Sequence, residues 1–260
     1  MLAAYPRMDL PHAARAPVKG GRPLKRWRYV GVFGDEVMAC FGVVRIGVLP
    51  QAFWAVLDAG GMRERTRFAP RAVDLRDGVV RVRDVADLRV QPDGEAIAVT
   101  NRHGAQEIWT RKTPARVRGT LAGVVVDLPA LIDDSAGYHA RVTDWEWAAG
   151  AGTTADGRDV RWNLVTGIHD GATGSERRVW VDGVPREVGP VTFSEALDEV
   201  RFAEGGALRF AARAERARHD NVLLFASEYR QPFGTVSGTL PGDIELTSGA
   251  GVMERHHARW

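Results

Sequence analysis

Short runs of apolar residues, or of apolar and polar residues in alternation, recur along almost the whole chain. The clearest runs lie at 28–34, 37–49, 51–58, 79–85, 95–100, 106–111, 115–128, 159–169, 222–229 and 235–240. Many are separated by pairs such as Asp77-Gly78, Asp156-Gly157 and Asp182-Gly183, in which glycine supplies the positive φ that a tight hairpin turn requires. Runs divided by turns at this spacing predict an all-β barrel or sandwich.

The number of runs indicates more than one small barrel. About sixteen strand candidates exceed the roughly eight strands of a ligand-binding barrel. We therefore predict two packed antiparallel β-barrels, or one barrel and a large sheet. The expected divisions are a basic extended arm at 1–27, a barrel-like domain at 28–127 and a second barrel-like domain at 138–260.

The seam between the two halves is expected at 127–137, where Pro129 and Gly137 interrupt the pattern. Helical periodicity is weak along the whole chain. We expect only a few short helices, at 13–15, 128–134 and 211–218.

Composition narrows the class of protein. The 260 residues include 29 Gly and 13 Pro, which suits a chain with many turns. A single cysteine, Cys40, excludes a disulfide framework and any site built from several cysteines, and we interpret it as a buried apolar residue. No apolar run approaches the ~18 residues of a membrane span, and no signal-peptide pattern opens the sequence. We therefore expect a cytoplasmic protein with no integral membrane segment.

The formal net charge of +2 hides an asymmetry. Residues 1–28 hold seven basic residues and one acidic residue, a net +6, so the remaining chain carries −4. Prolines at 6, 11, 17 and 23 prevent a long helix in this arm, which we expect to lie as an extended strap on the body. Contact with an anionic partner is the alternative. The mildly acidic body argues against a nucleic-acid binder.

Residues that could take part in catalysis or ligand binding are concentrated in the second half of the chain. The first group lies at 138–147. On a strand His139, Trp145 and Trp147 share one face, whereas Tyr138, Asp144 and Glu146 share the other. Aromatic rings with a few polar groups suit the wall of a ligand pocket. A carboxyl beside indole rings is a candidate proton donor. The alternative is that both tryptophans are core residues and that the carboxylates are solvated or paired with arginines.

Three further segments offer pocket residues. Trp162 and Asn163 lie on opposite faces of one run, which ends in His169-Asp170, either a proton relay or a turn. Tyr229 begins a run of polar residues between glycines and aromatics, and His256 shares a face with Glu254 near the C-terminus. Structural hydrogen bonding is the alternative reading of these polar residues.

Other chemistries have little support. The sequence has neither a Gly-x-Ser-x-Gly nucleophile motif nor a phosphate-binding loop. A metal site from His139, His169 and His256 has no support in their spacing, so neither a metal nor a cofactor is expected.

Several longer motifs resemble a bacterial family, domain-of-unknown-function family 2804. They lie at 26–34, 43–47, 53–56, 109–112, 136–141, 162–170, 176–190, 229–240 and 251–254. Together they cover roughly 22–260. The family is similar, more distantly, to two-lobed calycin-like proteins, which include carotenoid hydratases, tocopherol-cyclase-like proteins and lipocalin-type cyclases.

That resemblance implies two lipocalin-like barrels and a pocket for an apolar or polyene ligand. In the hydratases, a carboxylate near Tyr, Trp and His is thought to protonate an alkene. The segment of this chain most similar to that arrangement is Asp144-Trp145-Glu146-Trp147, with Tyr138 and His139 upstream.

Two functions follow from these patterns. The first is an acid–base hydratase, isomerase or cyclase for an alkene, polyene or terpenoid-like molecule, with Glu146 or Asp144 as the acid and His139 or His256 as a relay. Its expected ligand-binding residues are Tyr138, Trp145, Trp147, Trp162, Asn163, His169, Tyr229 and His256. The second is a carrier that holds a lipid-like ligand in the same pocket without proton transfer. Both need an apolar small-molecule ligand.

Overall fold

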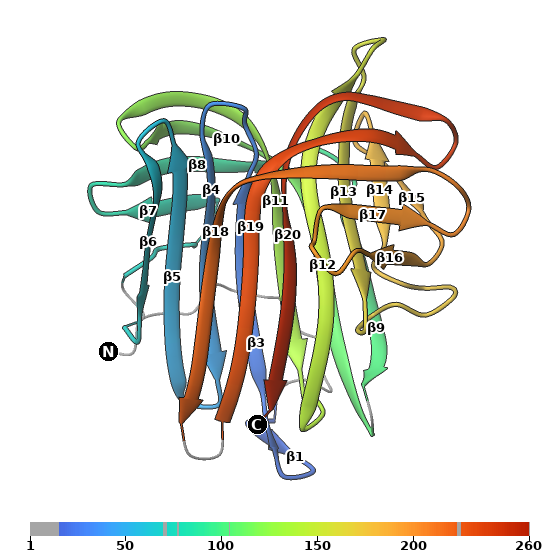
Figure 1. Cartoon of the computed structure of the whole chain (residues 1–260). Coiled ribbons are helices and arrows are strands. Elements are labelled where there is room, and N and C mark those ends of the chain that lie inside the picture. The colour runs from blue at the N-terminus through green and yellow to red at the C-terminus, as the bar shows by residue number, and fades with distance from the viewer. Residues whose placement is uncertain (1–15, 70–71, 77, 104, 223–224, 260) are drawn as a thin grey trace.

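The computed structural model describes residues 16–259 apart from 70–71, 77, 104 and 223–224, and these residues form strands joined by turns (Figure 1). Two nine-stranded sheets and one two-stranded sheet contain all the strands of the described chain. The described residues contain no helix at all, and hence none of the length and apolarity that a membrane span needs. The all-β prediction is confirmed.

The N-terminal half of the chain builds the first large sheet. Its strands in spatial order are β6 (Gly61–Arg67), β5 (Leu49–Asp58), β4 (Met38–Ile46), β3 (Lys25–Val32), β11 (Val124–Gly137), β10 (Gln106–Leu121), β8 (Ala86–Pro92) and β7 (Val79–Val82). β10 pairs first with β9 (Ile97–His103) and then with β8, so the sheet divides along this strand. The small sheet of β1 (Val18–Lys19) and β2 (Arg22–Pro23) precedes β3.

The C-terminal half builds the second large sheet. Its spatial order is β15 (Val184–Glu187), β14 (Arg178–Val181), β13 (Asp159–Thr166), β12 (Val142–Thr154), β20 (Ile244–Arg259), β19 (Phe225–Leu240), β18 (Ala207–Val222), β17 (Glu199–Phe202) and β16 (Val191–Phe193). Every strand pair in it is antiparallel.

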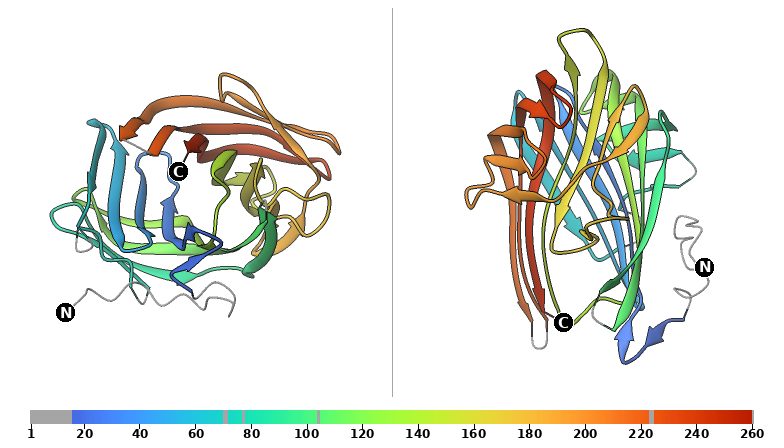
Figure 2. Two further views of the ribbon diagram at one scale, coloured as in Figure 1. Left: turned by 90° about the horizontal axis from the view of Figure 1, so that it is seen from below. Right: turned by 90° about the vertical axis from the view of Figure 1, so that its right-hand side faces the viewer.

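Seen along the strands, the two sheets curve around a shared interior (Figure 2). One apolar cluster, with Phe41 and Leu88, is made of residues from the first sheet and the loops between its strands. A second, with Trp162, belongs to the second sheet and its loops. A third lies between the sheets and joins Phe33 to Phe233. Burial of apolar surface therefore stabilises each sheet and also their contact.

The sheets also meet along two edge strands. β6 is the last strand of its sheet, and beyond Arg209 the strand partner of β18 is β19 alone. Side chains bridge the two edges, which we call the β6–β18 seam. Arg216 Nε lies 2.7 Å from Glu64 Oε2, and the Arg218 guanidinium lies 5.8 Å from the centre of the Phe68 ring.

Of the three short helices that the sequence predicts, two are strands in the structure and one lies outside the described residues. Residues 128–134 and 211–218 are strand, in β11 and β18, and 13–15 lie outside the described residues. In β18, pairing with β19 along its whole length overrides the helix preference of the Ala- and Arg-rich sequence. The expected seam at 127–137 is most of β11, so the chain passes between sheets at 138–141. The division into an arm at 1–27 and barrel-like domains at 28–127 and 138–260 stays a prediction.

One contact between the halves gives a stability prediction. Trp180 is fully buried between the sheets, and its Nε1 donates to the Glu95 carbonyl oxygen at 2.8 Å. Trp180→Phe removes this hydrogen bond and part of a buried ring, so we expect it to lower the free energy of unfolding by about 1–3 kcal/mol. Urea unfolding measures the change. Val184→Ala, at a 65% exposed position on the same hairpin, is the control; equal midpoints for both variants would contradict the prediction.

Candidate functional site

A cavity of about 960 Å³ lies between the two sheets. Its wall combines residues of β3 to β6, β10 and β11 with residues of β12, β13, β18, β19 and β20 and of the segment between β13 and β14. Aromatic rings supply much of this wall, among them Trp27, Tyr29, Phe53, Trp145 and Trp147. A space of this size and lining suits a largely apolar small molecule.

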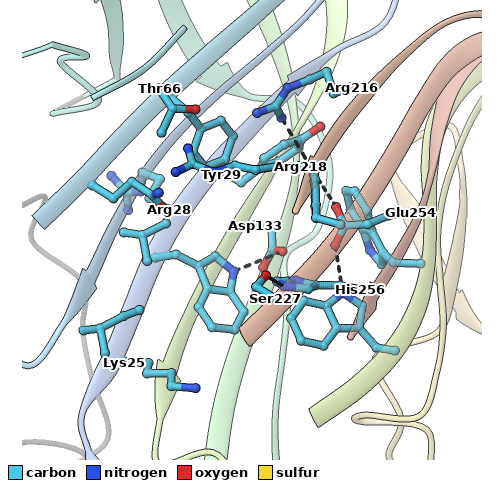
Figure 3. A pocket seen from close by; sticks show the side chains of 18 of the residues that line it. Lys25, Arg28, Tyr29, Thr66, Asp133, Arg216, Arg218, Ser227, Glu254 and His256 are labelled. Carbon is cyan, nitrogen blue, oxygen red and sulfur yellow. Dashed lines mark hydrogen bonds between the residues drawn. The ribbon is translucent and has the colours of Figure 1, made fainter. Parts of the chain in front are cut away.

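Glu254 on β20 is the most distinctive polar group of the wall. Its Oε1 accepts a hydrogen bond from Trp145 Nε1 at 2.8 Å. Its Oε2 accepts from Gln231 Nε2 at 3.0 Å and from the Tyr229 hydroxyl at 3.1 Å. Figure 3 shows the carboxyl near His256 on the same side of the cavity. Adjacent antiparallel strands β12, β20 and β19 bring these side chains together.

Burial makes Glu254 a weak acid. Removal from water raises the pKa of this carboxyl to about 7, although hydrogen bonds from Trp145 and Tyr229 and the charge of Arg216 lower it. Asp133 adds a smaller upward effect. Glu254 therefore holds a proton in a large fraction of molecules at neutral pH, which is the state that a proton donor needs.

Arg216 connects this carboxyl to the β6–β18 seam. Its Nη1 donates to Gln231 Oε1 at 3.1 Å, and its Nε lies 2.7 Å from Glu64. The guanidinium also lies 4.7 Å from the centre of the Phe53 ring. The seam thus places a fixed positive charge beside Gln231, one of the donors to Glu254.

A second polar cluster joins residues of the first sheet to Glu176, which lies between β13 and β14 of the second sheet. Lys112 Nζ is 2.7 Å from Asp133 Oδ1 and 3.3 Å from Glu176 Oε1. Trp27 Nε1 also donates to Asp133, at 3.4 Å. Burial alone would lower the pKa of Lys112, but the two carboxylates raise it. Lys112 is therefore the cation that compensates two buried acidic groups.

The cavity histidines are neutral. Burial lowers the pKa of His169 and of His256 to about 3, and lowers the pKa of His139 well below its usual value. His256 Nε2 lies 2.8 Å from the Ser227 hydroxyl. No three His, Cys, Asp or Glu side chains of the described residues form a group that could hold a metal ion.

The structure brings six of the sequence-predicted site residues to the cavity wall. They are His139, Trp145, Trp147, His169, Tyr229 and His256. Asp144 and Glu146 do not line it, because alternation along β12 turns them away from Trp145 and Trp147. Asp144 contacts exposed His257, and Glu146 pairs with Arg255 at 2.5 Å.

The other three predicted residues lie behind or away from the cavity. The Tyr138 hydroxyl donates to the Ala16 carbonyl oxygen, in a small apolar cluster. Trp162 packs in the core of the second sheet, where an added Cβ on Gly150 would lie 2.2 Å from its ring. Asn163 sits behind the wall, accepting from Trp147 Nε1 at 2.8 Å and donating to the Glu176 carbonyl oxygen at 2.9 Å.

Sequence reasoning missed much of the site. Alternation places Glu254 on the same strand face as His256, but it does not mark Glu254 as the buried acid. Tyr29, Lys112 and Asp133 come from the first half of the chain, where no candidate was named. Alternation was the available signal for Glu254, and none pointed to the other three residues.

Comparison with known proteins supports the fold. A model of the domain of unknown function DUF2804 matches residues 127–260. The crystal structure of a "putative AttH" from Nitrosomonas europaea superposes with a TM-score of 0.54 at 14% identity, covering 97% of this chain and 98% of that chain. Kievitone hydratase from Nectria haematococca superposes with a TM-score of 0.52 at 10% identity, covering 91% and 88%. No curated protein sequence matches the chain.

At these identities the two structures show a shared fold, and the sheets described above are consistent with the calycin-like architecture that the motifs implied. The family model covers more than half of the chain, including Tyr229, Gln231 and Glu254. The family resemblance is confirmed, and the chain belongs to the DUF2804 family, a domain family of unknown function.

Proposed function

We propose that this protein is an acid–base enzyme that protonates an apolar, unsaturated small molecule held between its two sheets. The observation that carries the proposal is Glu254, a buried carboxyl on the wall of an aromatic cavity with a pKa raised to about 7. Hydration is the favoured reaction, since a hydratase is among the proteins that share the fold. Glu254 replaces Glu146 and Asp144 as the proposed acid.

The surroundings of Glu254 suit both the donation of its proton and the stabilisation of the carboxylate that remains. The protonated carboxyl gives its proton to one carbon of the ligand double bond, and the neighbouring carbon becomes cationic. Faces of Trp145 and other rings stabilise that cation. The carboxylate left behind is stabilised by its hydrogen bonds from Trp145, Tyr229 and Gln231. Water then bonds to the cationic carbon, and its surplus proton returns to Glu254.

Isolation of the ligand tests the proposal. We expect an apolar unsaturated molecule to co-purify with the protein and to be identified by mass spectrometry of an organic extract. Incubation of that molecule with protein in ¹⁸O-labelled water should yield a product heavier by one labelled water. Recovery of the molecule unchanged after prolonged incubation would contradict the enzyme and favour the carrier.

A further inference from the structure

Three buried side-chain atoms of cavity-lining residues, one carboxylate oxygen and two histidine nitrogens, have no hydrogen-bond partner among the described residues. They are Glu176 Oε2, His169 Nε2 and His139 Nε2. Their residues are 3%, 6% and 3% exposed. A buried polar atom left unpaired costs about 1–3 kcal/mol, so a bound group that satisfies these atoms is expected.

The hydrogen-bond network fixes which nitrogen of His169 carries the proton. Asn101 Nδ2 donates to the Gly174 carbonyl oxygen at 3.2 Å, so Asn101 Oδ1 is the acceptor of that amide. This Oδ1 lies 2.9 Å from His169 Nδ1, which must therefore be the N–H donor. The neutral ring then has only a lone pair at Nε2. His169 offers an acceptor, as does the free oxygen of Glu176.

The charges around these atoms favour a neutral donor over a cationic one. Glu176 is already paired with Lys112 at 3.3 Å, and Lys112 also pairs with Asp133. A ligand ammonium would meet Lys112 at the same carboxylate, whereas a hydroxyl group would not be repelled. A hydroxyl also donates one hydrogen bond while remaining compatible with an otherwise apolar ligand.

We propose that His169, Glu176 and His139 form a subsite for a hydroxyl group, so that the ligand is a hydroxylated and otherwise largely apolar molecule. The inference rests on the proposed function, because it requires an apolar ligand in the cavity. It goes beyond that function by naming the polar group of the ligand and the residues that select it. Glu254, in its own network with Tyr229 and Gln231, remains the proton donor.

Two matched probes test the subsite in the full chain. 4-Hydroxybiphenyl and 4-methoxybiphenyl share an apolar body, but only the first has a hydroxyl donor. Isothermal titration calorimetry should show the phenol binding about 5- to 10-fold more tightly, the effect of one hydrogen bond. Equal affinities, as expected if ordered water alone satisfies these atoms, would overturn the subsite and leave the proposed function standing. Failure of both probes to bind would contradict both proposals.

The variant His169→Asn assigns the preference to one atom. An asparagine amide can keep the donor to Asn101, tolerates the positive φ of 52° at this position, and lacks the Nε2 acceptor. We expect the phenol preference to disappear in His169→Asn and to persist in the control His257→Asn, outside the cavity. Loss of the preference in Glu176→Gln alone would support the subsite with the hydrogen bond at Glu176 Oε2 instead, because a hydroxyl donates only once. An undiminished preference in both cavity variants would overturn the proposal.

Discussion

Glu254→Gln is expected to lower kcat by about 10²- to 10⁴-fold, the usual contribution of a general acid. Glutamine keeps the volume of the side chain and an acceptor for Trp145 Nε1, but it has no proton to transfer. The measurement is turnover of the molecule identified from the cavity. Circular dichroism and thermal unfolding should show that the variant folds.

Glu146→Gln is the matched control, since Glu146 pairs with Arg255 and does not line the cavity. We expect its kcat to equal that of the wild type. Wild-type turnover by Glu254→Gln would remove Glu254 as the acid, and a large loss in Glu146→Gln would return the role to the residue named from the sequence.

The pH dependence of the wild type follows from the same carboxyl. Because the acid form of Glu254 is required, kcat/KM should fall about tenfold per pH unit above a pKa of about 7. Folding raises this pKa from the ordinary value of 4.5. The protonated form therefore favours the folded state below pH 4.5, and this contribution is lost as the pH rises through about 7. Glu254→Gln should remove that part of the stability profile.

Lys112→Met is expected to lower the free energy of unfolding by about 3–5 kcal/mol, which is the cost of removing one partner of a buried ion pair. The side chain of Lys112 is 3% exposed and contacts both Asp133 and Glu176. Methionine leaves these carboxylates buried without their cation. Urea unfolding at pH 7 measures the loss.

The loss should shrink in acid. Burial raises the pKa of Asp133 and the charge of Lys112 lowers it, so the pKa of Asp133 is higher still in Lys112→Met. The folded variant is therefore favoured when Asp133 is protonated and loses stability as the pH rises. The surface control Arg63→Met breaks an ion pair with Asp58 and should cost less than 1 kcal/mol. A Lys112→Met loss no larger than that of the control would contradict the prediction.

How much of this structure the sequence predicts depends on how far apart along the chain the interacting residues lie. Alternation correctly separates Trp145 and Trp147 from Asp144 and Glu146, and Asp-Gly pairs mark hairpins such as that at Asp182-Gly183, because both signals are local. Pro129 was expected to mark a break between the two halves of the chain, but it lies within β11.

The site itself depends on long-range pairing. Glu254 becomes a buried acid only because β20 lies between β12 and β19, which bring Trp145 and Gln231 to it. Lys112 reaches the same cavity from the other sheet. Neither contact has a signature in the neighbouring residues, so no local pattern could have named the acid or its distant partners.

The β6–β18 seam also bears on how the wall of the cavity is held together. Separating two paired strands elsewhere in these sheets breaks a ladder of backbone hydrogen bonds, whereas the two edges of the seam are bridged by side chains such as Arg216 with Glu64. Glu64, Thr66, Phe68 and Arg218 from these edges line the cavity. The cavity wall along this seam can therefore open by the loss of side-chain contacts, without the rupture of a backbone ladder.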